Sequence, residues 1–230
     1  MFVPLYDSNT LRRIDWPIVT WSIILVTIAV YFLFQAGEAG RAASLTLMRF
    51  GTIPSVLTDR AVLPPEAAGL PETLSLVTYA FLHGDLMHLG GNMLFLWVFG
   101  DNVEDAMGHI RFIFFYVACS VAGALAYVFA FPASDAVLIG ASGAVSGVVA
   151  AYLMLHPRVK LWFLALGKIP LRLRAQWVLG FWIALQFYNL LTDPNGSVAW
   201  IAHVGGLIAG AILIVFMRRR GTPLFDRTPS

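Results

Sequence analysis

Apolar residues gather in separate runs along the chain, divided by polar segments. A transmembrane helix needs about 20 predominantly apolar residues. Four runs meet or approach that length: 16–34, 111–131, 176–191 and 198–217. Two shorter runs carry polar groups that would be costly against lipid and must therefore lie among the other helices: 87–100 and 142–155. The pattern predicts an all-α, polytopic membrane protein, a six-transmembrane-helix bundle.

Composition supports a membrane setting. Of the 230 residues, 59% are hydrophobic and only 12% are charged, whereas soluble domains are typically about half apolar and a quarter charged. The net charge of +2 is small, and no basic tract is interleaved with aromatic residues. A nucleic-acid partner is therefore not expected.

The positions of Lys and Arg predict an orientation, because cytoplasmic loops carry an excess of positive charge. With six spans, only Arg41, Arg49 and Arg60 fall on one side, in the long segment 37–85, and the other twelve fall on the opposite side. The chain is expected to form a single membrane domain over residues 1–230. Both of its ends are expected to be short tails on the cytoplasmic side. Segment 37–85 is expected to be an ordered external loop, partly in the interface. No organelle-targeting segment is evident, which favours a bacterial inner membrane.

Polar residues recur at one depth of the predicted bundle. His88 and Asn92, Ser142, and His203 each fall in the first turn or two of a helix that enters from the external side. Ionisable residues at membrane depth are costly and usually mark a function. Their shared depth suggests that they form one site in the outer part of the membrane.

Small residues beside Ser142 and His203 could bring these two side chains together. They recur at every fourth position, which permits close helix approach: Gly143 and Gly147 in one helix, and Ala202, Gly206 and Gly210 in the other. His203 could then act as general base for the Ser142 hydroxyl. No carboxylate in either helix could orient the histidine, so the pattern indicates a Ser-His dyad. His88, Asn92 and the Ser142 backbone N–H are candidate oxyanion donors.

Each of these residues also has an ordinary structural interpretation. The small residues around Ser142 could serve packing alone, His203 could be a hydrogen-bonded core histidine, and Asn92 could join two helices. His83, His88 and His203 could bind a metal, but the carboxylate or thiolate usual in catalytic zinc sites is missing, so no metal is predicted. The shared depth and the two small-residue stripes favour a site over independent packing roles.

The combined motifs resemble the rhomboid family of intramembrane serine proteases. The likeness covers roughly residues 75–215 in order and spacing, and five stretches carry it: His83, His88-Leu89-Gly90-Gly91-Asn92, Glu104-Asp105-Ala106-Met107-Gly108-His109-Ile110-Arg111-Phe112, Gly140-Ala141-Ser142-Gly143 and Ala202-His203-Val204-Gly205-Gly206. Two features depart from the family. Segment 37–85 has no tryptophan, and Ser146 stands where some members place an aromatic residue against the catalytic histidine.

The resemblance implies a set of roles. Ser142 would be the nucleophile and His203 the base, with His88 and Asn92 at the oxyanion positions; His83 and Gly140 would be accessory. Substrates would be single-span membrane proteins cut near their external end, and no cofactor is implied. Two alternatives stay open: a catalytically inactive rhomboid-like protein that binds membrane clients, and a small transporter. The absence of an internal repeat is unfavourable to a transporter.

Overall fold

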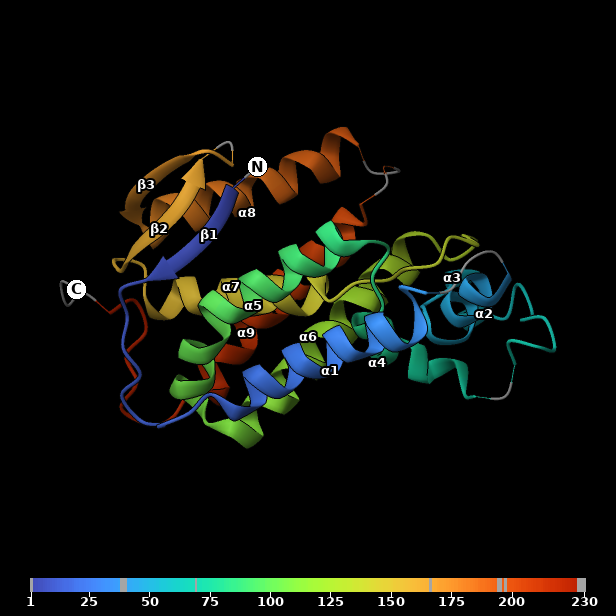
Figure 1. The fold of residues 1–230 in the computed structure, drawn as a ribbon, viewed down its shortest axis with the longest axis horizontal. Helices are drawn as coiled ribbons and strands as arrows, with labels where there is room; N and C mark the ends of the chain where they lie inside the picture. Colours follow the sequence, from blue (N-terminus) through green and yellow to red (C-terminus); the bar gives the residue numbers. More distant parts are fainter. Residues whose placement is uncertain are drawn as a thin grey trace.

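The computed structural model describes residues 2–37, 41–68, 70–165, 167–193, 196 and 198–226. Six long helices form the body of this part of the chain (Figure 1): α1 (Ile18–Phe34), α5 (Leu86–Met107), α6 (His109–Ala130), α7 (Ser142–Leu155), α8 (Ala175–Thr192) and α9 (Trp200–Met217). Each overlaps one of the six predicted runs. By length and composition, α6 and α9 are candidate membrane spans, while α1 and α7 are apolar but shorter.

Helix α5 is longer than the sequence indicated. A short helix over 87–100 was expected, but α5 continues to Met107 and has 22 residues. The added turns contain Asp101, Glu104 and Asp105, which look like a loop in the sequence. They stay helical because both carboxylates are buried and bonded: Asp105 accepts from the segment that leads into α1, and Glu104 accepts from the first turn of α1.

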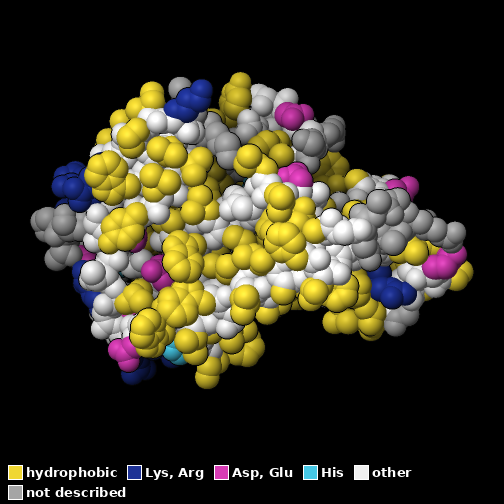
Figure 2. Space-filling model, viewed as in Figure 1, with side chains coloured by type: hydrophobic (Ala, Val, Ile, Leu, Met, Phe, Trp, Pro, Cys, Tyr) yellow, Lys and Arg dark blue, Asp and Glu magenta, His cyan; other side chains and the backbone are white. Residues whose placement is uncertain are grey.

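Helix α7 lies at the centre of the bundle, and its residues from Gly143 to Tyr152 are buried without interruption. Helices α1 and α8 lie outside it and carry exposed apolar side chains, including Leu33, Trp177 and Leu191. Hydrophobic side chains cover much of the face in Figure 2. Such extensive exposed apolar surface is rare on soluble monomers and suits contact with lipid.

A three-stranded antiparallel sheet stands at one end of the bundle (Figure 1), so the all-α expectation is wrong there. Its order is β1 (Phe2–Asp7), β2 (Lys160–Ala165) and β3 (Ile169–Arg174). Leu161 and Phe163 point inward and are buried, whereas Trp162 is exposed, which is the period-two pattern of a half-buried strand. The sequence had indicated a short polar tail for the segment that forms β1, and a basic loop for the segment that forms β2 and β3.

The sheet end is joined to the helices by buried polar contacts. The Asp7 carboxylate accepts from the Tyr152 hydroxyl at 2.6 Å and from the Asn102 amide at 3.1 Å. Glu104 accepts from the Thr20 backbone N–H at 2.8 Å and from the Thr20 hydroxyl at 2.7 Å. These bonds fix the N-terminal segment against α5 and α7.

The described residues of segment 37–85 are folded into short helices: α2 (Arg41–Phe50), α3 (Pro54–Leu57), η1 (Glu72–Leu74), α4 (Ser75–Thr78) and η2 (Tyr79–Phe81). Thr52 and Leu138 exchange two backbone hydrogen bonds, and the Ser55 hydroxyl donates to Asp135 at 2.6 Å. This segment therefore braces the irregular chain that leads into α7.

Candidate active site

Ser142 is the first residue of α7, as the sequence predicted, and its side chain is half-buried. The chain enters the helix through Gly140, whose φ of +112° is strained for any residue with a Cβ. A Cβ there would also lie 2.5 Å from His88 Nε2. The His88 ring therefore lies against the backbone two residues before Ser142, and glycine is required at position 140.

The turn before Ser142 is held by two buried residues. The Gly140 N–H donates to the Tyr79 carbonyl at 3.0 Å, and the Ala141 N–H donates to His83 Nε2 at 3.4 Å. Burial is the main cause that lowers the pKa of His83 to about 4, and His88 lowers it further. His83 is therefore neutral near pH 7 and can accept the Ala141 hydrogen.

His88 and Asn92 lie in the first two turns of α5. Asp85 caps this helix by accepting from the His88 backbone N–H at 2.8 Å. The Asn92 side chain is buried, and its amide donates to the His88 carbonyl at 3.1 Å. The Asn92 amide is thus bonded within its own helix, one turn from the ring that lies over Gly140.

The small-residue stripes of α7 and α9 face each other. A Cβ on Gly206 would overlap the carbonyl oxygen of Gly143, and one on Gly210 would overlap that of Gly147. On α6, a Cβ on Gly123 would lie 2.8 Å from the Ala202 carbonyl oxygen. Such close backbone approach is available only to glycine. It brings the N-terminal turns of α7 and α9, which carry Ser142 and His203, next to each other.

His203 is buried and is held by groups from two helices. Its Nδ1 lies 2.9 Å from Gln186 Oε1 on α8, and the Trp200 ring packs edge-on at 5.6 Å between centroids. Ser146 stands where some family members place an aromatic residue against the catalytic histidine. Its hydroxyl instead donates to the Ser142 carbonyl oxygen at 2.6 Å. Among the described residues, Ser142 and His203 form no hydrogen bond with each other.

Sequence reasoning missed Gln186. The only signal was an amide inside the apolar run 176–191, and nothing local indicated its partner. The His83 and His88 rings lie 5.0 Å apart. Within the described residues, no three His, Cys, Asp or Glu side chains are placed to hold a metal ion.

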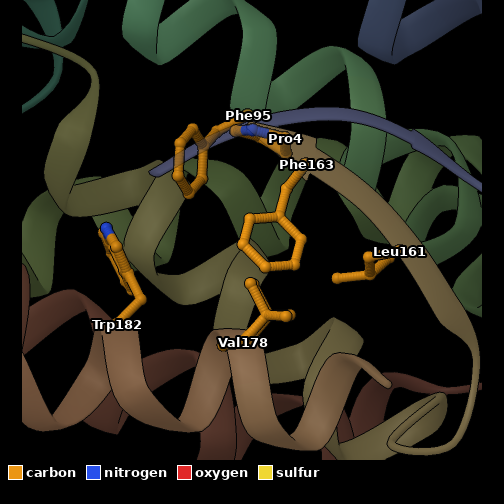
Figure 3. Close-up of a pocket in the computed structure, with 7 residues that line it drawn as sticks. Pro4, Phe95, Leu161, Phe163, Val178 and Trp182 are labelled. Carbon is orange, nitrogen blue, oxygen red and sulfur yellow. The ribbon is translucent and has the colours of Figure 1, made fainter. Parts of the chain in front are cut away.

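The cavity in Figure 3 lies between the sheet, α5 and α8, and none of its lining residues is a predicted site residue. Trp182 and Val178 from α8 line it together with Phe95 and Phe163. The cavity is apolar. Of its lining residues, Trp182 lies one turn before Gln186 on α8.

Comparison with protein families matches residues 71–220 to the Rhomboid domain. The chain belongs to the rhomboid family. The matched range contains every predicted site residue, from His83 to Gly210. Rhomboid proteins are embedded in membranes, which suits the exposed apolar side chains of α1 and α8.

Curated relatives include Rhomboid-related protein 3 of Homo sapiens, 28% identical over 97% of this chain and 54% of that protein. Rhomboid protease GluP of Bacillus subtilis is 30% identical over 84% of this chain and 34% of its own length. Rhomboid protein 1, mitochondrial, of Saccharomyces cerevisiae is 30% identical over 60% of this chain and 40% of its own length. The chain thus spans about half or less of these relatives, and only one of the three is named as a protease.

Proposed function

We propose that this rhomboid is an intramembrane serine endopeptidase that uses Ser142 as nucleophile and His203 as general base. The observation that carries the proposal is the glycine-mediated contact of α7 and α9, which puts the two residues on adjoining helix turns. His203 also has its Nδ1 engaged by an acceptor, so that Nε2 is available to take a proton.

The chemistry follows from these two groups. His203 Nε2 removes the hydroxyl proton as Ser142 Oγ attacks a peptide carbonyl carbon. The imidazolium then gives that proton to the leaving amine, and an acyl-enzyme forms. Water attacks the ester in a second step, with His203 again as base. Catalytic hydrogen bonds often tighten only when substrate is bound, which accommodates the lack of a hydrogen bond between Ser142 and His203 among the described residues.

The oxyanion formed at the carbonyl needs hydrogen-bond donors. His88 lies over Gly140, the Ser142 N–H is at a helix start, and the Asn92 amide lies one turn from His88. In the proposed mechanism, Asn92 exchanges its bond to the His88 carbonyl for one to the oxyanion. One such donor typically contributes about 100-fold or more in rate.

The position of Ser142 supports membrane proteins as substrates. Helix α7 has 14 residues, so at 1.5 Å per residue it spans about 21 Å of a hydrocarbon core of about 30 Å. With the sheet and its basic residues at the cytoplasmic face, Ser142 lies below the external surface. We propose that the chain cuts single-span membrane proteins near their external end, in a bacterial inner membrane, with both of its termini cytoplasmic.

The test combines labelling and proteolysis in proteoliposomes. Wild type should react with a fluorophosphonate probe and cleave a model single-span substrate, and Ser142→Ala should do neither. His203→Ala should lose both activities while remaining folded. A wild-type protein that binds the substrate without labelling or cleavage would instead be an inactive client-binding rhomboid. Flux of a small solute without cleavage would indicate a transporter.

A further inference from the structure

We propose that Gln186 is the positioning residue for His203: it holds Nδ1 protonated and leaves Nε2 as the base. The inference rests on the proposed function for its catalytic consequence, but the geometry stands independently. Gln186 is only 4% exposed, lies in the C-terminal half of α8 and places its Oε1 2.9 Å from His203 Nδ1.

The orientation of the Gln186 amide follows from its second bond. Its Nε2 donates to the Trp182 carbonyl at 3.0 Å, and a carbonyl can only accept. The opposite end of the amide, Oε1, is therefore the atom that meets His203, and Oε1 can also only accept. It follows that His203 Nδ1 carries the hydrogen. In a neutral imidazole the other nitrogen, Nε2, then has the free lone pair.

This role is the one that a buried aspartate performs in a serine protease triad, where the carboxylate fixes the histidine tautomer and also stabilises the imidazolium. Gln186 can perform the first task but brings no charge for the second. Trp200 on α9, whose ring packs edge-on against the His203 ring, brings none either, and His88 on α5 is the titratable group that acts on the His203 ring electrostatically. The site is thus a neutral triad.

The hydrogen bond between Gln186 and His203 also connects two helices, α8 and α9. Outward-facing side chains of α8 on both sides of Gln186 are exposed, including Phe181, Phe187 and Tyr188. The Gln186 amide is accordingly a buried polar contact on a helix that otherwise presents a largely apolar surface. The correct histidine tautomer therefore depends on α8 remaining against α9.

Three variants test the proposal in proteoliposomes, with kcat and KM measured separately on a model single-span substrate. Gln186→Leu removes the acceptor and should lower kcat by about 10- to 100-fold with KM within about twofold, a part of the 10²–10⁴ that general base catalysis supplies. Gln186→Glu keeps an acceptor and adds charge. It should retain more activity, and the acid limb of its pH–rate profile should move about one pH unit upward, because a carboxylate favours the imidazolium.

Asn189→Leu is the matched control, since Asn189 is a half-buried amide on the same helix, one turn further on. It should stay within about twofold of wild type. Equal losses in Gln186→Leu and Asn189→Leu would show that α8 is merely destabilised, and an unchanged kcat and pH profile in Gln186→Leu and Gln186→Glu would also overturn the proposal.

A readout without catalysis separates this inference from the proposed function. In protein labelled with ¹⁵N-histidine, the His203 resonances are assigned by comparison with His203→Ala. Wild type should show a protonated Nδ1 and an unprotonated Nε2, and Gln186→Leu a mixture of tautomers. A protonated Nε2 in wild type would overturn the assignment of Gln186. Failure of fluorophosphonate labelling with the expected tautomer would overturn only the protease proposal.

Discussion

The glycine contact between α7 and α9 makes Gly206 a sensitive position for both stability and activity. We consider Gly206→Ala, the smallest change that adds a Cβ. In the structure, that methyl group would lie 2.7 Å from the carbonyl carbon of Gly143 and overlap its oxygen. Both atoms belong to backbone, which cannot rotate away as a side chain can.

The size of the effect follows from this overlap. Ordinary van der Waals contact begins at about 3.4 Å, so the helices must separate by about 0.7 Å to accommodate the carbon and further to accommodate the oxygen. Overpacking of this kind typically costs about 1–3 kcal/mol, more than the roughly 1 kcal/mol that alanine gains over glycine in a helix. A displacement near 1 Å between catalytic groups can cost about 100-fold in rate. We expect Gly206→Ala to lower both stability and turnover, with turnover the more affected.

The assay is thermal unfolding in detergent micelles together with kcat in proteoliposomes. Gly180→Ala on α8 is the matched control, because nothing lies within 4 Å of a Cβ at that position. The control should retain wild-type activity and unfold at or slightly above the wild-type temperature, because alanine favours the helix by up to about 1 kcal/mol relative to glycine. If Gly206→Ala unfolded at the wild-type temperature and cleaved substrate at the wild-type rate, the close α7–α9 contact would not be what assembles the site.

Three further outcomes are expected. Asn92→Ala should lower kcat about 100-fold; a wild-type kcat in a folded variant would exclude an oxyanion role. Burial raises the pKa of Asp7 to about 6, so folding favours its protonated form: its contribution to stability is complete below about pH 4 and is lost as pH rises through 6. Asp7→Asn, whose side-chain oxygen can still accept from Tyr152 and Asn102, should therefore lose less stability than wild type between pH 4 and 7, measured as the unfolding midpoint, and parallel curves would contradict this reasoning. His83→Ala removes the acceptor for the Ala141 N–H and should lower kcat about tenfold, which the same cleavage assay can check against wild type.

Local features of the sequence were sufficient to locate the six long helices, though not the end of α5 at Met107. The start of α7 at Ser142 follows from a glycine that must adopt a positive φ, directly before an apolar helical run. The stripes containing Gly143 and Gly206 are likewise visible at a spacing of four, because one helix face repeats at that interval. These features depend on residues close together in the chain. In a membrane, such runs form helices because every backbone N–H and C=O must find its hydrogen-bond partner within the protein.

The remaining features depend on residues far apart in the chain, so only the tertiary structure decided them. Strand β1 pairs with β2 across most of the sequence, and no local pattern in either segment indicates which partner it will meet. The polar turn at Glu104 is held in the helix by hydrogen-bond donors from the first turn of α1, which is about 85 residues away in the chain. In the same way, Gln186 meets His203 only because α8 packs beside α9, and an amide in an apolar run does not by itself indicate which histidine it will hold.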